Sequence, residues 1–134
     1  HYFKGKTYPY FIYKKDRKPL AVGGLYSVWI HPKTQEEITS FSIVTTKGND
    51  FMATIHNNPK LAEPRSPLLL EKDQEDYWLF DINKPSDITP LKNVDNDFLE
   101  SNTVRPLSGK NYIGNTEKIS DPFHYPDLNP LTLF

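Results

Sequence analysis

The sequence predicts a mixed α+β fold that is mainly antiparallel β, with short helices flanking the strands. Short β-rich runs follow one another through the first 46 residues, while the apolar sets at helical spacing are brief. The chain also has 12 prolines in 134 residues, about 9%, well above the usual ~5%. They fall at the ends of the predicted elements, which fits rigid loop corners between short strands.

Composition limits the classes of function that need consideration. A length of 134 residues suffices for one ordinary domain with its own core. The chain has 16 Lys and Arg against 17 Asp and Glu, so any site for a polyanion must be local. No cysteine is present, which excludes disulfides, thiolate metal sites and a cysteine nucleophile within these residues.

The first three strands are predicted at residues 8–13, 20–30 and 37–46. Polar turns separate them, so we expect a hairpin of the first two strands and a three-stranded meander overall. The pair Gly23-Gly24 lies inside the second strand and requires a bulge, a bend or a close backbone approach. Aromatic residues occur on both faces of these strands. We therefore expect exposed apolar surface around Phe11, Tyr13 and Trp29 in the isolated chain.

The stretch Ser42–Leu70 carries the best candidates for chemistry. A strand feeds a short helix with apolar residues at 51, 52 and 55, and Asn57-Asn58-Pro59 must end that helix. His56 therefore lies at a helix C-terminus, where it can serve catalysis or only packing and capping. Arg65 lies between two prolines on the following loop, where it can face an anion or form a structural salt bridge.

The second half predicts fewer regular elements. The acidic run at 71–76 starts a helix whose apolar face is 77–80, and Trp78 is expected in the core. Short helical turns follow, then a last strand at 98–107. Residues 112–134 read as an irregular tail that wraps the domain or is partly ordered.

Familiar cofactor and metal motifs are not found in the sequence. There is no dinucleotide, phosphate-loop, zinc-protease or nucleophile-elbow pattern. The acidic stretch Asn93–Asp97 lacks the glycine and the terminal glutamate of a calcium loop. We therefore expect no cofactor and no metal.

Five blocks of the sequence, in this order, closely resemble the SOS response-associated peptidase (SRAP) family. Members of that family typically read P-x-(F/Y)-I, P-x-x-x-A-G-L-(W/Y)-x-x-W, F-x-I-(I/V)-T-T-x-A-N and I-H-x-R-M-P-x-I-L. The matching blocks are Tyr8–Ile12, Pro19–Trp29, Phe41–Asn49, Ile55-His56 and Arg65–Leu70. The segment Val104–Ser108 resembles the family's last strand more weakly.

The sequence also departs from the family pattern. Gly48 replaces the usual Ala, Ser66 stands where Met is common, and residues 57–64 lengthen the spacing from His56 to Arg65. The family's Cys-Gly-Arg start, its Asn-Ala-Arg block and its Gly-aromatic-aromatic-Glu motif are not in this sequence, which begins without Met. We therefore interpret residues 1–134 as the C-terminal half of a SRAP-like domain with a barrel core, and expect the N-terminal half to be its partner.

The resemblance implies a function. In that family an N-terminal cysteine is the autopeptidase nucleophile and also captures abasic sites in single-stranded DNA by closing a thiazolidine. His56 matches the active-site histidine, so the implied role is catalytic, and Arg65 matches the loop arginine, so the implied role is DNA binding. We expect a cytoplasmic, nucleoid-associated DNA-repair protein with no membrane partner, inactive in this part alone. The alternative is a non-catalytic module that keeps the fold for DNA or protein contacts.

Overall fold

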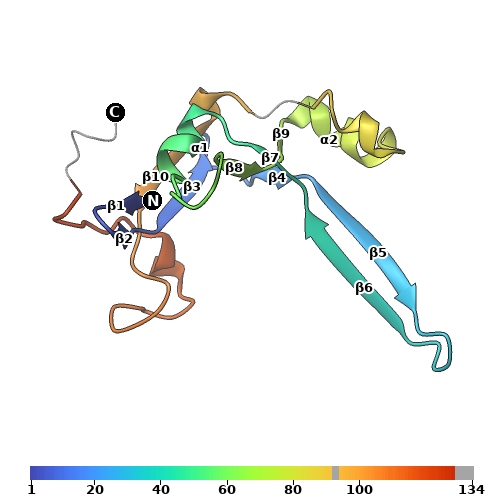
Figure 1. Cartoon of the computed structure of the whole chain (residues 1–134), viewed down its shortest axis with the longest axis horizontal. Coiled ribbons are helices and arrows are strands. Elements are labelled where there is room, and N and C mark those ends of the chain that lie inside the picture. The colour runs from blue at the N-terminus through green and yellow to red at the C-terminus, as the bar shows by residue number, and fades with distance from the viewer. Residues whose placement is uncertain (92–93, 129–134) are drawn as a thin grey trace. The chain divides into compact units, whose positions relative to one another are not determined.

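The computed structural model describes residues 1–91 and 94–128, which form two compact units (Figure 1). Unit 1 is built from His1–Pro19, Gly48–Arg65 and Asp95–Phe134, and unit 2 from Leu20–Lys47 and Ser66–Val94. The fold is α+β with mostly antiparallel pairs, as predicted. The described strands form separate two-stranded sheets and do not close into a barrel, which would give every strand two neighbours. No described helix has the length and apolar character needed to cross a membrane.

Unit 1 is organised around the pairing of two strands that are distant in sequence. β3 (Tyr10–Lys14) pairs antiparallel with β10 (Leu99–Thr103). A small hairpin precedes them, in which β1 (Tyr2–Phe3) and β2 (Lys6–Thr7) are joined by residues 4 and 5, both at positive φ. The remaining elements are α1 (Asp50–Ile55) and two 3₁₀ turns, η2 (Asn96–Phe98) and η3 (Glu117–Ser120). The buried apolar residues of this unit are Tyr8, Met52, Ile55, Leu99, Val104 and Leu128.

The predicted hairpin of residues 8–13 with 20–30 is wrong, and the predicted meander therefore loses its first strand. β3 takes its partner from the far end of the chain, with Lys14 opposite Leu99. Leu99 is buried, so this long-range pairing provides apolar burial that the local turn at residues 15–19 does not provide. A β-rich apolar run identifies a strand but not its neighbour.

Unit 2 contains the predicted hairpin of the second and third strands. β5 (Gly24–Ile30) pairs antiparallel with β6 (Glu37–Ile43) over its whole length. β4 (Ala21–Val22) pairs with β9 (Leu69–Leu70), and β7 (Thr45–Lys47) pairs with β8 (Arg65–Pro67). The helical elements are α2 (Lys72–Phe80) and the 3₁₀ turn η1 (Pro85–Asp87). The buried side chains among the described residues of this unit are those of Ser66, Leu68, Leu69, Leu70 and Val94.

Gly23 is a point of close approach, as expected from the glycine pair. A Cβ on this residue would lie 3.1 Å from Trp78 Cη2 and 3.3 Å from Leu68 Cδ2. The backbone of Gly23 is also bonded on both sides, because its N–H donates to Leu68 O and its carbonyl accepts from Val44 N, each at 2.9 Å. The predicted core position of Trp78 is met in part, since the residue is half-buried against this backbone.

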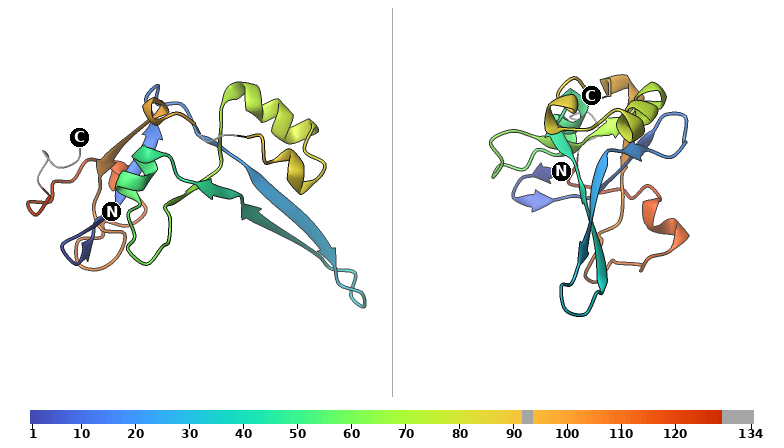
Figure 2. Two further views of the ribbon diagram at one scale, coloured as in Figure 1. Left: turned by 45° about the horizontal axis from the view of Figure 1, so that its top comes forward. Right: turned by 90° about the vertical axis from the view of Figure 1, so that its right-hand side faces the viewer.

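The β5–β6 hairpin has large exposed apolar side chains on both faces. Figure 2 shows its two strands side by side and twisting about one another. Tyr26 and Phe41 lie opposite each other and are 79% and 81% exposed, and Trp29 on the other face is 51% exposed. Phe11 in unit 1 is exposed and Tyr13 is half-buried. The expected exposed apolar surface is confirmed for Phe11 and Trp29.

The apolar residues that end α2 are not in a core. Leu79 and Phe80 are 70% and 75% exposed, and no residue of α2 is fully buried. The prediction of a helix here is confirmed, including its acidic first turn, but its apolar face remains largely open within the described residues.

The described part of the tail, residues 112–128, packs on unit 1. Phe123 N donates to Thr103 O at 2.8 Å, and the Tyr125 hydroxyl donates to Val104 O at 2.8 Å. Asp127 accepts from Lys6 Nζ at 2.7 Å. The tail is therefore fixed to the end of β10 and to the first hairpin. Residues 129–134 lie outside the described residues, as does Asn93 of the acidic stretch considered above.

Candidate functional site

His56 directly follows α1, at the helix C-terminus that the sequence predicts. The helix begins at Asn49, whose side chain accepts a hydrogen bond from Met52 N at 2.9 Å. Met52 and Ile55 bury one side of the helix, and the His56 N–H donates to Met52 O at 2.7 Å. The backbone then leaves the helix, and His56 is exposed. The imidazole is therefore not sealed in a core, which the packing interpretation would require.

The residues beside His56 are anchored to the first strand. Asn57 Oδ1 accepts from Tyr2 N at 2.6 Å, and Asn57 Nδ2 donates to Tyr2 O at 2.9 Å. Two residues before His56, the carbonyl of Thr54 lies 2.9 Å from the Nδ1 of His1. These contacts fix the backbone on both sides of an exposed imidazole. A fixed backbone restricts where the ring can reach, which is a requirement for proton transfer in a site.

Arg65 lies at the other end of the loop that follows His56, and the base of this loop is closed. The Gly48 N–H donates to Pro64 O at 2.9 Å, and a Cβ at residue 48 would lie 3.1 Å from Met52 Cβ. The Arg65 guanidinium is 4.0 Å from a carboxylate oxygen of Glu63, and both side chains are 48% exposed. The salt-bridge interpretation of Arg65 thus has a partner, although one at long range.

Sequence reasoning missed a groove of about 790 Å³ in unit 1, formed by side chains of β3, α1 and β10. Tyr10, Phe51 and Thr54 line it, together with all five residues of β10. The Tyr10 hydroxyl is buried, and it has no hydrogen-bond partner among residues 1–91 and 94–128. Burial raises the pKa of Tyr10 above its usual value. His56 is not among the residues that line this groove. No local pattern could have indicated it, because its walls are distant in sequence.

A family comparison identifies the chain. A sequence model of the family described as SOS response associated peptidase (SRAP) matches residues 2–110. No match was found among curated proteins.

Solved structures give the same result for the fold. A protein from Bacteroides thetaiotaomicron, solved as a structural genomics target, aligns with 27% sequence identity and a TM-score of 0.75, covering 92% of this chain and 51% of that one. A protein from Bordetella bronchiseptica aligns with 23% identity and a TM-score of 0.60, covering 76% of this chain and 47% of that one, and supports the fold alone. The chain thus spans about half the length of the solved proteins that it matches. By the family match over most of its residues, this chain belongs to the SRAP family, the SOS-associated family of DNA repair.

Proposed function

We propose that the protein containing this chain captures abasic sites in single-stranded DNA as a covalent adduct and has autopeptidase activity, and that residues 1–134 supply the C-terminal half of its domain. One observation carries this proposal: His56, in the Ile-His block that resembles the family's active-site block, is exposed at the anchored end of α1. An exposed imidazole on a fixed backbone suits proton transfer near neutral pH.

The proposed chemistry needs two groups that this chain does not contain. The α-amine of an N-terminal cysteine attacks the aldehyde carbon of the ring-opened sugar, and loss of water gives an imine. The cysteine sulfur then adds to the imine carbon, its proton passes to the nitrogen, and the thiazolidine is closed. In this scheme His56 gives a proton to the sugar oxygen as the ring opens. The cysteine would come from the other half of the domain.

Arg65 is proposed to contact a phosphate of the bound strand. Its side chain is 48% exposed, so the guanidinium N–H groups can reach a phosphate oxygen of a bound strand. The prolines at 64 and 67 restrict the backbone around this arginine.

The other half of the domain is the proposed partner of the open apolar surfaces. A two-stranded ribbon is marginally stable in water, and three or more strands with a buried face are needed for independent stability. The exposed Tyr26 and Phe41 pair provides such a face, and the solved relative from Bacteroides thetaiotaomicron is about twice as long as the matched region. Additional strands on this hairpin would also extend the separate sheets toward the barrel that the resemblance implies.

A second candidate is a non-catalytic module that uses the fold to bind DNA or protein. Residues 1–134 contain no cysteine, so this part alone can serve binding but not the covalent step.

The test is covalent capture by the full-length protein. An oligonucleotide with one abasic site is incubated with protein, and a heat-resistant adduct is measured on a denaturing gel. His56→Ala should slow adduct formation about 100-fold, the low end for loss of a general acid or base. His124→Ala, at another exposed histidine of unit 1, is the matched control and should react like the wild type.

Three outcomes decide between the proposals. No adduct with the wild-type full-length protein supports the binding module. Normal adduct formation by His56→Ala would show that His56 has a structural role only. Residues 1–134 alone should form no thiazolidine, since they contain no cysteine; a stable adduct from them would overturn the proposed chemistry.

A further inference from the structure

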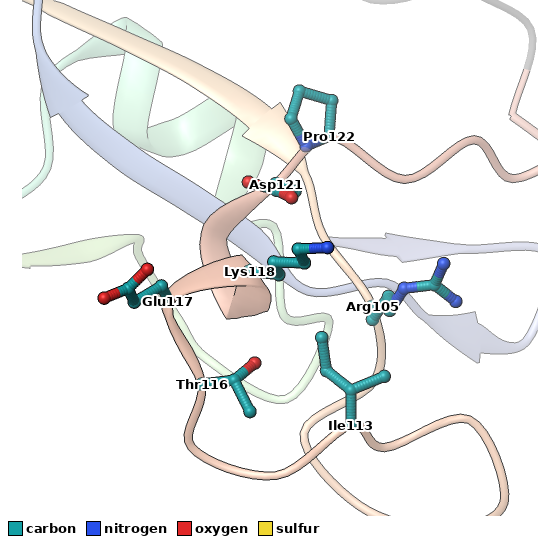
Figure 3. A pocket seen from close by; sticks show the side chains of 7 residues that line it. All are labelled: Arg105, Ile113, Thr116, Glu117, Lys118, Asp121 and Pro122. Atoms are coloured by element: carbon teal, nitrogen blue, oxygen red, sulfur yellow. The ribbon is translucent and has the colours of Figure 1, made fainter.

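A second groove of unit 1, of about 690 Å³, lies where the tail packs beside the end of β10 (Figure 3). Arg105 lines it from the segment after β10, and Thr116, Glu117, Lys118 and Asp121 line it from η3 and the residues beside that turn. All of these residues belong to one unit, and none lies in the stretch 42–70 that carries His56 and Arg65.

The Arg105 guanidinium is held in place by an aromatic ring. Its Cζ lies 4.7 Å from the centroid of the Phe123 ring, in a cation–π contact. Phe123 is itself fixed, because its N–H donates to Thr103 O at 2.8 Å and its carbonyl accepts from Thr103 Oγ1 at 2.7 Å. A second ring, Tyr125, packs edge-on at 4.9 Å. One face of the guanidinium is therefore covered, while its N–H edges remain available to a ligand.

The two cations of this groove are not neutralised by the neighbouring carboxylates. Within residues 1–91 and 94–128, neither Arg105 nor Lys118 has an Asp or Glu oxygen within 4.0 Å. Figure 3 shows the Arg105 and Lys118 side chains extending toward the same side, and Glu117 pointing away from both. Asp121 is the carboxylate that lies between the η3 turn and Pro122, next to Lys118 in the figure.

Unit 1, which contains this groove, has a net positive charge, whereas unit 2 has a net negative charge. Unit 1 contains 11 Lys and Arg against 9 Asp and Glu, whereas unit 2 contains 5 against 8. The chain as a whole is slightly acidic, so its positive charge is concentrated in unit 1. A polyanion is therefore attracted to unit 1 and repelled by unit 2.

We propose that this groove binds a phosphodiester of a single DNA strand through Arg105 and Lys118, as a contact separate from Arg65. A guanidinium fork pairs with two phosphate oxygens, and an ammonium adds a point charge beside it. The Thr116 hydroxyl lines the same groove and can donate to a phosphate oxygen. The identity of the ligand as DNA rests on the proposed function, while the phosphate chemistry follows from the groove itself.

The test is the salt dependence of binding to an unmodified single-stranded oligonucleotide, measured by fluorescence anisotropy with the full-length protein. Loss of one phosphate contact should make the plot of log K against log salt concentration less steep by about 0.7 for single strands. Between 50 and 200 mM salt, the affinity of such a variant should therefore fall by about threefold less than that of the wild type. Arg105→Ala and Lys118→Ala should each show this loss. Lys33→Ala, at an exposed lysine of unit 2, should not.

Two further variants separate charge from folding. Asp121→Asn removes a negative charge from the groove and should strengthen binding, an effect that a misfolded variant cannot produce. Arg105→Lys keeps the positive charge but loses the forked N–H donors of the guanidinium. It should bind DNA more tightly than Arg105→Ala and keep most of the wild-type salt dependence. Circular dichroism of each variant confirms the fold.

The outcomes also separate this proposal from the covalent chemistry. Arg105→Ala and Lys118→Ala should weaken the binding of unmodified and abasic DNA alike, whereas His56→Ala should slow the covalent step at every DNA concentration. An unchanged salt slope in both cation variants overturns the proposal. The proposal is also overturned if Arg105→Ala loses the binding of inorganic phosphate, measured by calorimetry, but keeps the binding of DNA. The groove would then serve a small phosphorylated ligand.

Discussion

The indole Nε1 of Trp78 donates a hydrogen bond to the carbonyl oxygen of Gly24 over 3.3 Å. The same ring lies against the preceding residue, so the second helix is fixed to the start of β5 by one aromatic side chain. This contact depends on a residue without a side chain at position 23, because a Cβ there would lie only 3.1 Å from the ring.

Gly23→Ala should therefore destabilise the protein. The new Cβ would be 3.1 Å from Trp78 Cη2 and 3.3 Å from Leu68 Cδ2, closer than ordinary contact, and overpacking of this kind costs about 1–3 kcal/mol. Gly24→Ala is the control, since its nearest atom would be Ser42 O at 3.6 Å. Chemical denaturation measures both. Equal free energies of unfolding for the two variants would show that the Trp78 ring moves aside without cost.

Tyr10→Phe should stabilise the protein. The hydroxyl is buried without a partner among the described residues, and an unsatisfied buried polar group costs about 1–3 kcal/mol. Removing the oxygen should raise the midpoint of thermal unfolding. Tyr26→Phe, at a side chain that is 79% exposed, should leave it unchanged. A lower midpoint for Tyr10→Phe would mean that the hydroxyl has a partner in the intact protein.

Docking of the tail should weaken in acid. Hydrogen bonds from Lys6 and then Tyr8 lower the pKa of Asp127 below its usual 3.8. A carboxyl with a lowered folded-state pKa contributes stability above its unfolded pKa and loses it as the pH falls through the folded pKa. Hydrogen-exchange protection of residues 123–128 should therefore fall below about pH 4. Asp127→Asn should show the weaker protection already at neutral pH; protection equal to wild type there would contradict this contact as the anchor.

If the proposed N-terminal half of the domain covers the β5–β6 hairpin, the fluorescence of Trp29 should change when that half binds. In residues 1–134 it is 51% exposed, so its fluorescence should have the long emission wavelength of a solvent-exposed indole. A Trp78→Phe background leaves Trp29 as the single tryptophan. Adding the proposed N-terminal half, expressed separately, should shift the emission to shorter wavelength. An unchanged spectrum on a complex that has formed would place the partner elsewhere.

Local elements could be predicted because their signals are local. The short helix before His56 was predicted from apolar residues at 51, 52 and 55 and from its ending at Asn57-Asn58-Pro59, and both signals lie within nine residues. The β5–β6 hairpin and the close approach at Gly23 were predictable for the same reason. The place of His56 directly after this helix followed from the same local reasoning.

Long-range relationships could not be predicted from the sequence. Nothing near residues 10–14 indicates that their partner is β10, since a β-rich apolar run shows a strand but not its partner. The edge-to-face contact of Tyr8 with Tyr125, at 5.0 Å, likewise joins opposite ends of the chain. The exposure of Leu79 and Phe80 was missed for another reason: an apolar helix face predicts burial, but not which chain segment provides it.

The pairing of β3 with β10 sets an order for folding during synthesis. Leu99 follows Lys14 by about 85 residues, and ribosomes add roughly 5–20 residues per second, so β3 waits on the order of 5–15 s for its partner. Unit 2 has all of its residues by Val94, before the last segment of unit 1 begins at Asp95. The nascent chain can thus complete unit 2 first, while an aromatic strand from its beginning remains open to chaperones or to wrong pairing.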